Sequence, residues 1–519
     1  MLPLEILYFL SAVMLAAYGF NSAFLTWLFW RYKQQSSQES CEQTDASQNQ
    51  LSPQDTDTST FPMVTVQLPI YNERHVTKRL IEASVALDWP ADRLQVQVLD
   101  DSTDDTTEIV AGVLMDIQTK QTGKTICGIE HVRRPTREGY KAGALAYGMD
   151  TAKGEYIVIF DADFVPTSSF LRQTIPYFAD ATIGCVQTRW GHINPTTSPL
   201  TQAQALGIDG HFRVEQYVRD QLGAFLNFNG TAGVWRRTCM EDAGGWEGDT
   251  LTEDLDLSYR AQLRGWRMVY QPDVVVPAEL PVQVDAFKRQ QFRWAKGSFQ
   301  TAIKLLRQVW SANEPTWRKA LGTLHLTNYL VHPLMLLNLL LLLPMTSSQS
   351  IFLKIAPFLT TAAIGPPIMY WTALTFRDFS GFPDAAGPRG KQRTGETLWS
   401  KIRQLGILMA LGTGLSINNT RAVYEAVAGV YSEFKRTPKF AVTSRSTNWQ
   451  SSTYALPRNP IVWIELALSC YATWLLVYCI AAGIWWMVGW VFLYAIGYGY
   501  ISGLAFLQSW QLRMARKNA

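Results

Sequence analysis

The stretch EYIVIFDADF, residues 155–164, joins a run of apolar residues to two carboxylates that lie one residue apart. The runs VTVQLPI at 64–70 and LQVQVLD at 94–100 are rich in the same residues, which is typical of strands. Between those two runs, apolar residues recur at helical spacing over 76–87. Strands and helices that alternate in this way predict an α/β domain with a Rossmann-like mixed, mostly parallel sheet covered on both faces.

Carboxylates follow two of these predicted strands. Asp100 and Asp101 close one, and Asp161 and Asp163 close another. The carboxyl ends of parallel strands share one edge of a sheet, and ligands gather there. If the last segment stays extended, the side chains of Asp161 and Asp163 face the same way and together suit a hard divalent cation. Acids at a strand end are most often solvated loop residues, so one pair alone leaves both interpretations open.

Two further groups of polar residues follow in the same domain. Thr252 suits the N-cap of a helix whose first turn holds Glu253 and Asp254, and capping alone accounts for acids at that position. In QQFRWAKG at 290–297, Arg offers a fork of donors to phosphate and Trp a flat face to a sugar ring. Arg and Trp are also common at the bilayer interface, so an anchoring role is the alternative.

Taken in order, these groups resemble the D, DxD, TED and QxxRW motifs of processive family 2 glycosyltransferases: Asp100-Asp101, Asp161-Ala162-Asp163, Thr252-Glu253-Asp254, and Gln290 with Arg293 and Trp294. The stretches LPIYNE (68–73), GYKAGAL (139–145) and FNGTAGVWR (228–236) are similar to plant cellulose synthase-like A and C proteins, the β-mannan and xyloglucan-backbone synthases, and to their bacterial relatives. The resemblance covers residues 61–310 and implies a GT-A fold and inverting hexosyl transfer.

The resemblance also implies a role for individual residues. Asp163, with Asp161 beside it, would hold Mg²⁺ or Mn²⁺, although Asp161 alternatively contacts the nucleotide sugar. Asp254 would be the general base that takes the proton of the acceptor hydroxyl. The other residues expected to bind the nucleotide sugar are Tyr71, Glu73, Asp100 or Asp101, Lys141 and Arg293. Those expected to bind the acceptor are Gln290, Trp294 and Glu253.

A further similarity lies outside that domain, in EFKRTPKF at 433–440. Phe434, Thr437 and Lys439 have the spacing of the FxVTxK gating loop of bacterial cellulose synthase, and Arg436 stands where that motif has Val. The resemblance implies a candidate gating loop. A basic loop that lies against lipid headgroups is the alternative interpretation.

Apolar segments long enough to cross a bilayer lie on both sides of the predicted transferase domain. They are an N-terminal helix within 1–33 and four segments of a second region at 311–519, near 326–345, 351–376, 460–483 and 486–509. We expect 34–60 to be a disordered linker and 405–430 to lie in the membrane interface. Lys and Arg beside the spans predict an external N-terminus and a cytosolic transferase domain.

Composition argues against a nucleic-acid-binding protein and against a zinc site. The 519 residues carry a net charge of only +3 with scattered Lys and Arg, which argues against nucleic-acid binding. The six cysteines lack zinc-ligand spacing. We expect a multi-pass protein of the plasma membrane, or of the Golgi in a eukaryote, that moves a hexose from UDP-glucose or GDP-mannose to a growing β-linked polysaccharide and exports the product, with accessory export subunits as candidate partners. The alternatives are a glycolipid synthase acting on ceramide or diacylglycerol, and a sensor or scaffold with a degenerate transferase domain.

Overall fold

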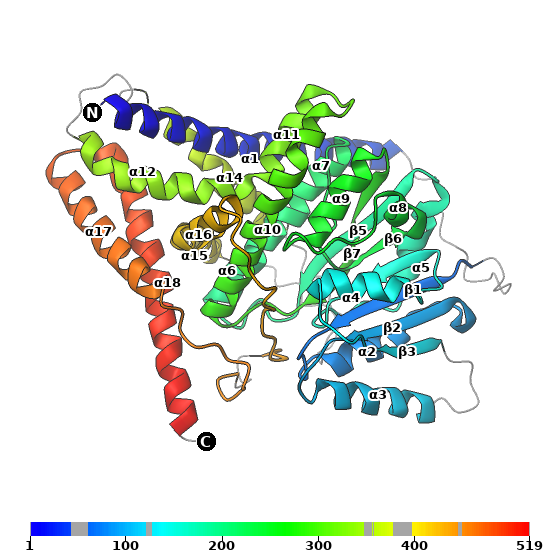
Figure 1. Cartoon of the computed structure of the whole chain (residues 1–519). Helices are drawn as coiled ribbons and strands as arrows, with labels where there is room; N and C mark the ends of the chain where they lie inside the picture. The colour runs from blue at the N-terminus through cyan, green and yellow to red at the C-terminus, as the bar shows by residue number, and fades with distance from the viewer. Residues whose placement is uncertain are drawn as a thin grey trace.

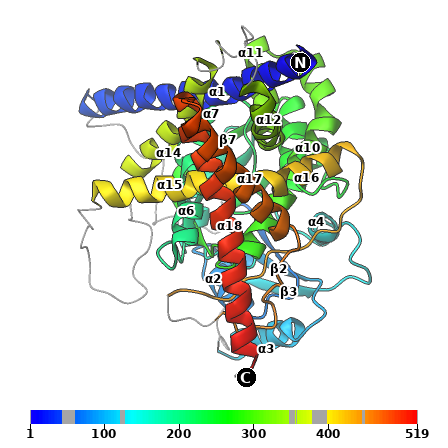
Figure 2. The ribbon, with the colours of Figure 1, turned by 90° about the vertical axis from the view of Figure 1, so that its left-hand side faces the viewer.

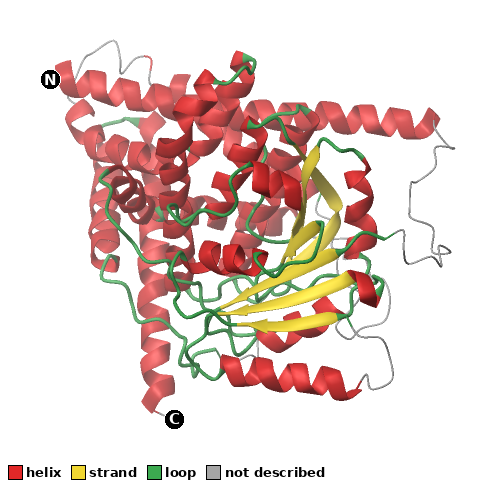
Figure 3. Cartoon of the chain, turned by 45° about the vertical axis from the view of Figure 1, so that its right-hand side comes forward, coloured by secondary structure: helices red, strands yellow, loops and turns green. Residues whose placement is uncertain are grey.

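A seven-stranded mixed sheet forms the centre of the first large domain (Figure 3). The computed structural model describes residues 2–42, 61–120, 127–346, 355, 358–376, 397–444 and 449–517. The strands are β1 (Val64–Ile70), β2 (Leu94–Asp100), β3 (Gly128–Val132), β4 (Tyr156–Ile159), β5 (Ile183–His192), β6 (Gly233–Arg236) and β7 (Arg267–Ala278). Their order is β3-β2-β1-β4-β6-β5-β7. Only β6 runs antiparallel to its neighbours, so the predicted mostly parallel α/β sheet is confirmed.

Helices cover both faces of this sheet, as Figure 1 shows. They are α2 (Thr77–Val85), α3 (Thr106–Lys120), α4 (Tyr140–Met149), α5 (Phe170–Thr174), α8 (Arg237–Asp242), α9 (Glu253–Leu263) and α10 (Val284–Ser311), with short 3₁₀ turns η2 (Ala91–Arg93) and η3 (Ile175–Ala179). Alternate residues of β4 enter different cores: Val158 packs with one apolar cluster, and Ile157 and Ile159 pack with the other. Both faces of the strand are therefore buried, which is why its sequence is continuously apolar.

A helical segment between β5 and β6 joins the sheet to the membrane helices. It consists of α6 (Pro199–Asp209), a π-helical turn η4 (Gly210–Gln216) and α7 (Tyr217–Gln221). Val214 and Val218 of this segment share an apolar cluster with Phe29 near the N-terminus and with Ala373.

The remaining elements form a second, helical region. They are α1 (Leu2–Glu42), α11 (Thr316–Leu326), η5 (Asn328–Leu330), α12 (Val331–Thr346), η6 (Thr361–Ile364), α14 (Gly365–Thr375), α15 (Leu398–Gly414), α16 (Ser416–Val427), α17 (Val462–Ala481) and α18 (Trp485–Lys517). Within the described residues, four helices have the length and composition of membrane spans: Leu2–Gln35, Asn328–Thr346, Val462–Ala481 and Trp485–Lys517. The helices α15 and α16 lie across α18 (Figure 2).

The structure differs in detail from the predicted layout. Helix α1 continues to Glu42, into the segment expected to be a linker, and residues 43–60 lie outside the described part of the chain. The span predicted at 351–376 also lies partly outside it, so that span stays a prediction. The segment 405–430 contains the break between α15 and α16. Glycine brings α1 and η6 into backbone contact, because a Cβ on Gly19 would lie 2.6 Å from the carbonyl carbon of Ala362.

Candidate active site

A polar cavity of about 150 Å³ lies at the carboxyl edge of the sheet. Segments far apart in the sequence form its wall: the residues after β1, β4 and β7, the starts of α4 and α9, one face of α10, and the loop after α16. All the site residues predicted from the sequence line this cavity except Asp100: Tyr71, Glu73, Asp101, Lys141, Asp161, Asp163, Glu253, Asp254, Gln290, Arg293, Trp294, Phe434, Thr437 and Lys439.

Asp100 does not line the cavity, so its contact with the nucleotide sugar stays a prediction. Its side chain is buried, and it accepts hydrogen bonds from the backbone N–H of Ser102 at 2.8 Å and from the Thr107 hydroxyl at 2.8 Å. Burial alone would raise the pKa of Asp100, but hydrogen bonds from His131, Ser102 and Thr107 outweigh it and lower the pKa to about 2. Asp100 therefore fixes the loop after β2.

Asp101 does line the cavity, on the turn after β2. Arg134 holds both of its carboxylate oxygens, with Nε to Oδ1 at 2.8 Å and Nη2 to Oδ2 at 2.6 Å. Beside it the Arg137 guanidinium lies 3.5 Å from the centre of the Tyr71 ring. Arg137 lines the cavity and was missed from the sequence, where nothing distinguishes it from the other arginines.

Asp161 and Asp163 do not lie on an extended segment, so the condition under which both side chains would face the same way is not met. Strand β4 ends at Ile159, and the chain turns so that the Phe164 N–H donates to the Asp161 carbonyl at 3.0 Å. The two carboxylates then engage different lysines: Lys141 Nζ is 2.6 Å from Asp161 Oδ1, and Lys439 Nζ is 2.6 Å from Asp163 Oδ2. The turn separates their environments because the alternation of a strand no longer applies.

Two glutamates complete the acidic side of the cavity around Asp163. The Glu279 backbone N–H donates to Asp163 Oδ2 at 3.1 Å, and burial raises the pKa of Glu73 to about 7. One carboxylate oxygen of each glutamate is buried and has no hydrogen-bond partner among the described residues. Hard oxygen donors of this kind suit Mg²⁺ or Mn²⁺. Glu279 was missed, although it follows the apolar run of β7 just as Asp161 follows that of β4.

Asp254 lies in the first turn of α9, at the cavity wall. Its Oδ1 accepts from the Leu255 N–H at 2.9 Å. Burial, together with the neighbouring Glu253 carboxylate, raises the pKa of Asp254 to about 7 despite the opposing charge of Lys141. The predicted N-cap position of Thr252 is right, but its hydroxyl makes no cap and contacts the Thr301 hydroxyl at 3.2 Å instead.

The raised pKa of Asp254 predicts a pH dependence of the transfer rate. The general base predicted at Asp254 would act only when ionised, so the rate is expected to fall about tenfold per pH unit below about pH 7 and to level off above it. The measurement is kcat/KM for the donor, from initial rates at subsaturating donor, from about pH 5 to about pH 9. A rate that stays constant down to pH 5 would contradict an essential carboxyl with a raised pKa.

Gly230 is the backbone element that separates Asp254 from Lys141. Its φ is +80°, and a Cβ there would lie 2.9 Å from Asp254 Oδ2 and 3.3 Å from Lys141 Nζ. Lys141 Nζ also donates to the Gly230 carbonyl at 2.9 Å. Because Gly230 has no side chain, the Asp254 carboxylate and the Lys141 ammonium can both lie next to its Cα.

Gly230→Ala is expected to lower the transfer rate by about a hundredfold, because it displaces a reacting group by a fraction of an ångström or more. Gly245→Ala is the matched control: that glycine has φ +72°, but a Cβ there would meet no atom within 4 Å. Both variants pay the same backbone strain of about 1–3 kcal/mol. Equal loss of activity in the two variants would show that strain, rather than the collision, is responsible.

The loop after α16 crosses the cavity next to α10. The Arg293 guanidinium lies 4.3 Å from the centre of the Phe434 ring, and the rings of Trp294 and Trp190 lie 6.4 Å apart. Thr437 is buried, and its hydroxyl has no partner among the described residues. Arg436, the departure from the gating motif, lies 3.8 Å from Glu73 Oε1 and packs on Tyr454 with 4.3 Å to the ring centre.

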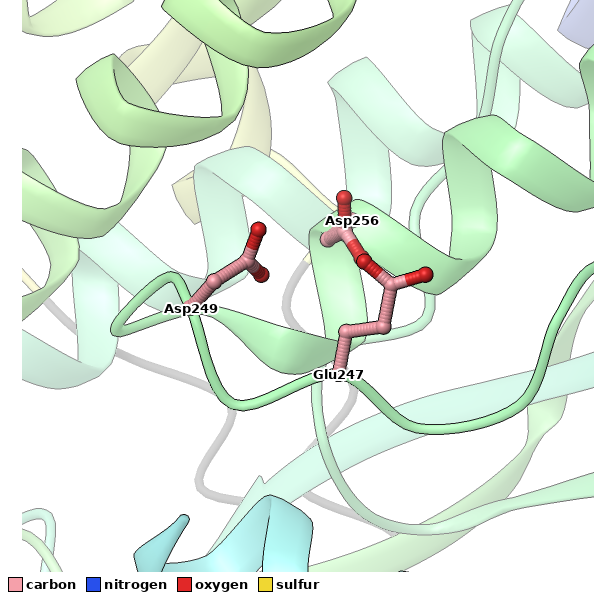
Figure 4. A group of neighbouring side chains, drawn as sticks. All are labelled: Glu247, Asp249 and Asp256. Carbon is pink, nitrogen blue, oxygen red and sulfur yellow. The ribbon is translucent and has the colours of Figure 1, made fainter.

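A separate acidic group consists of Glu247, Asp249 and Asp256 (Figure 4). None of the three lines the cavity. The Lys304 ammonium pairs with all three, at 2.8 Å from Asp249 Oδ2 and 3.0 Å from Asp256 Oδ1. A side-chain cation therefore already occupies the position between these three carboxylates.

Residues 62–297 match the family model described as "Glycosyltransferase like family 2". A probable glucomannan 4-β-mannosyltransferase 7 of Oryza sativa subsp. japonica is 45% identical over 258 residues, which are 49% of this chain and 43% of that protein. Glucomannan 4-β-mannosyltransferase 2 of Arabidopsis thaliana is 43% identical over 255 residues, 48% of this chain and 47% of that protein. The match thus spans less than half the length of these two relatives.

Among solved structures, a mannosyltransferase from Pyrobaculum calidifontis, in complex with GDP-Man and Mn²⁺, aligns with a TM-score of 0.50. It is 21% identical, and the alignment covers 82% of this chain and all of that one. At this identity the likeness concerns the fold, and it agrees with the sheet described above. Residues 62–297 therefore form a GT-A-like domain that is similar to family 2 glycosyltransferases and to the plant glucomannan 4-β-mannosyltransferases, in a chain with four helices long and apolar enough to cross a membrane among its described residues.

Proposed function

We propose that the chain transfers mannosyl units from GDP-mannose to the end of a β-linked mannan, on the cytosolic side of the plasma membrane or of the Golgi membrane. The single observation that carries this proposal is the convergence of Asp254, Lys141 and Arg293 on one cavity in a domain 45% identical to a probable glucomannan mannosyltransferase. The choice of mannose over glucose rests on the names of such relatives and on the GDP-Man held by the Pyrobaculum calidifontis neighbour.

In the proposed reaction Asp254 takes the proton of the acceptor hydroxyl as that oxygen attacks the anomeric carbon. The attack comes from the side opposite the diphosphate, so an α-linked donor yields a β-linked product. Lys141 and Arg293 offer positive charge to the leaving diphosphate. A divalent cation bound by Asp163, with Asp161 beside it, would neutralise further diphosphate charge. For Asp163 to receive it, Lys439 must leave the carboxylate oxygen that it holds at 2.6 Å.

We assign the acceptor to the side of the cavity formed by α10. Trp294 and Trp190 offer aromatic faces for sugar rings, and Gln290 and Glu253 line the same cavity. Phe434, Thr437 and Lys439 would move with the donor as a gating loop. Because α10 leads directly into the membrane helices, we further propose processive extension coupled to export of the polymer.

The proposal is tested by incubating the purified membrane protein with labelled GDP-mannose, UDP-glucose and GDP-glucose in parallel. We expect label to be transferred from GDP-mannose and GDP to be released in equal amount. Preference for UDP-glucose would contradict the donor assignment. Release of nucleotide without transfer to any glycan would contradict the acceptor assignment.

A further inference from the structure

A second cavity, of about 410 Å³, lies among the membrane helices. Its size is that of a small-molecule site, for which about 300–1,000 Å³ is usual. Side chains of α1, α12, α14, α15 and α18 line it, and most are aliphatic or aromatic. Examples from different helices are Ala16, Leu339, Met369 and Val491.

Several polar groups on this wall are already hydrogen-bonded within the protein. The Tyr494 hydroxyl donates to the Met335 carbonyl at 2.9 Å, and the Tyr18 hydroxyl donates to the Thr327 carbonyl at 3.0 Å. Asn338 accepts from the Ser11 hydroxyl at 2.8 Å. A sugar unit presents hydroxyls on every side, and such hydroxyls would lose water here without gaining partners. A hydrocarbon chain that moved here from the bilayer would exchange one apolar environment for another, without a cost in solvation free energy.

One end of the cavity is polar, because the Arg219 side chain reaches it from α7. The Arg219 side chain is 1% exposed, and its Nε and Nη2 contact Glu215 Oε1 at 3.1 and 3.0 Å. Its Nη1 is buried and has no hydrogen-bond partner among the described residues, and the same holds for Asn21 Oδ1 on the same wall. A buried donor without a partner costs stability unless a ligand atom accepts from it.

Contacts of Glu215, the partner of Arg219, indicate which domain the polar end of the cavity faces. His211 contacts Glu215 Oε2 through Nδ1 at 3.0 Å and Asn229 Oδ1 through Nε2 at 3.1 Å. Asn229 lines the transferase cavity, so the polar end of the membrane cavity faces the transferase domain. These residues belong to or adjoin the π-helical turn η4, an irregularity that frequently marks functional sites.

We propose that this cavity binds one membrane phospholipid, with an acyl chain among α1, α12, α14, α15 and α18 and a headgroup ester or phosphate oxygen that accepts from Arg219 Nη1. The lipid comes from the leaflet on the transferase side. The apolar wall selects a chain, and the buried Arg219 donor at one end fixes its orientation. This site does not depend on the proposed donor or product of the transferase.

The test uses the full chain in nanodiscs that contain a phospholipid with a photoreactive diazirine near the end of one acyl chain. We expect the label on cavity residues of α1 or α18. Ala16 lines the cavity whereas Ala17 is exposed, so Ala16→Trp is expected to lower this labelling roughly tenfold or more and Ala17→Trp to leave it unchanged. Ala12→Phe blocks the same wall and replaces Ala16→Trp if that variant does not fold.

Equal labelling of the cavity residues in the wild type and in the blocked variants would overturn the proposal, as would labelling confined to the outer faces of the helices. A glycan recovered from the cavity after turnover, in place of the lipid, would also overturn it. Arg219→Gln is expected to preserve chain labelling in part but to shift it along the helix, because the headgroup loses its donor.

Discussion

Asp254→Asn is expected to lower the rate of sugar transfer by about 10²–10⁴-fold, the usual contribution of a general base. Asn keeps the size of the side chain and an oxygen that can accept from the Leu255 N–H, which lies 2.9 Å from Asp254 Oδ1. The fold and the nucleotide-sugar site are therefore expected to survive. The measurements are steady-state transfer rates and calorimetric binding of GDP-mannose to the same preparation.

Asp116→Asn is the control for this variant, because Asp116 is exposed on α3 and lies far from the cavity in sequence and structure. It should change neither measurement. Near-normal turnover of Asp254→Asn would refute the base assignment. Loss of donor binding together with turnover would assign Asp254 to the donor site instead.

Asp163→Ala is expected to remove metal-dependent transfer, with a loss of about a hundredfold or more, because the diphosphate charge is no longer neutralised. The structure offers a sharp comparison, since Lys439 Nζ holds Asp163 Oδ2 at 2.6 Å. If Asp163 acts only as the partner of Lys439, then Lys439→Met should reproduce the defect. If it holds a cation, Lys439→Met should keep dependence on Mn²⁺ or Mg²⁺.

The readout is activity against metal concentration after removal of bound metal with EDTA. We expect the wild type and Lys439→Met to recover activity on addition of Mn²⁺ and Asp163→Ala to remain inactive. Wild-type activity that is unchanged in EDTA would contradict the metal site. Glu279 lies beside Asp163 and is the first alternative ligand if Asp163→Ala retains metal-dependent activity.

The central strands of the sheet were predictable because β1, β2 and β4 are buried and rich in Val, Ile and Leu. The position of β4, for example, follows directly from YIVIF. The acids after β2 and β4 were predictable as neighbours because the carboxyl ends of parallel strands share one edge of the sheet, and the residues on α9 and α10 were predicted by their resemblance to family motifs. The internal pairing of the site was not predictable. Whether Asp161 faces Lys141 or a cation depends on a turn that begins one residue after the strand, and alternation along a strand cannot foresee it.

Contacts between residues far apart in the chain could not be predicted from the sequence. Asp100 and Asp101 are neighbours of the same type, yet His131 and Thr107 hold the first inside the domain and only the second lines the cavity. The Lys439 contact with Asp163 joins residues 276 positions apart. The role of Lys439 could be suggested only by resemblance to a known loop, and its partner only by the structure.

The most direct test of the account is the chemical nature of the product made from labelled GDP-mannose by the purified membrane protein. The product is separated into ethanol-insoluble and organic-extractable fractions, and the insoluble fraction is digested with an enzyme specific for β-1,4-mannan. The account predicts an ethanol-insoluble product that the enzyme degrades and that Asp254→Asn does not make. Label confined to the organic-extractable fraction, or an insoluble product that resists the enzyme, would contradict it.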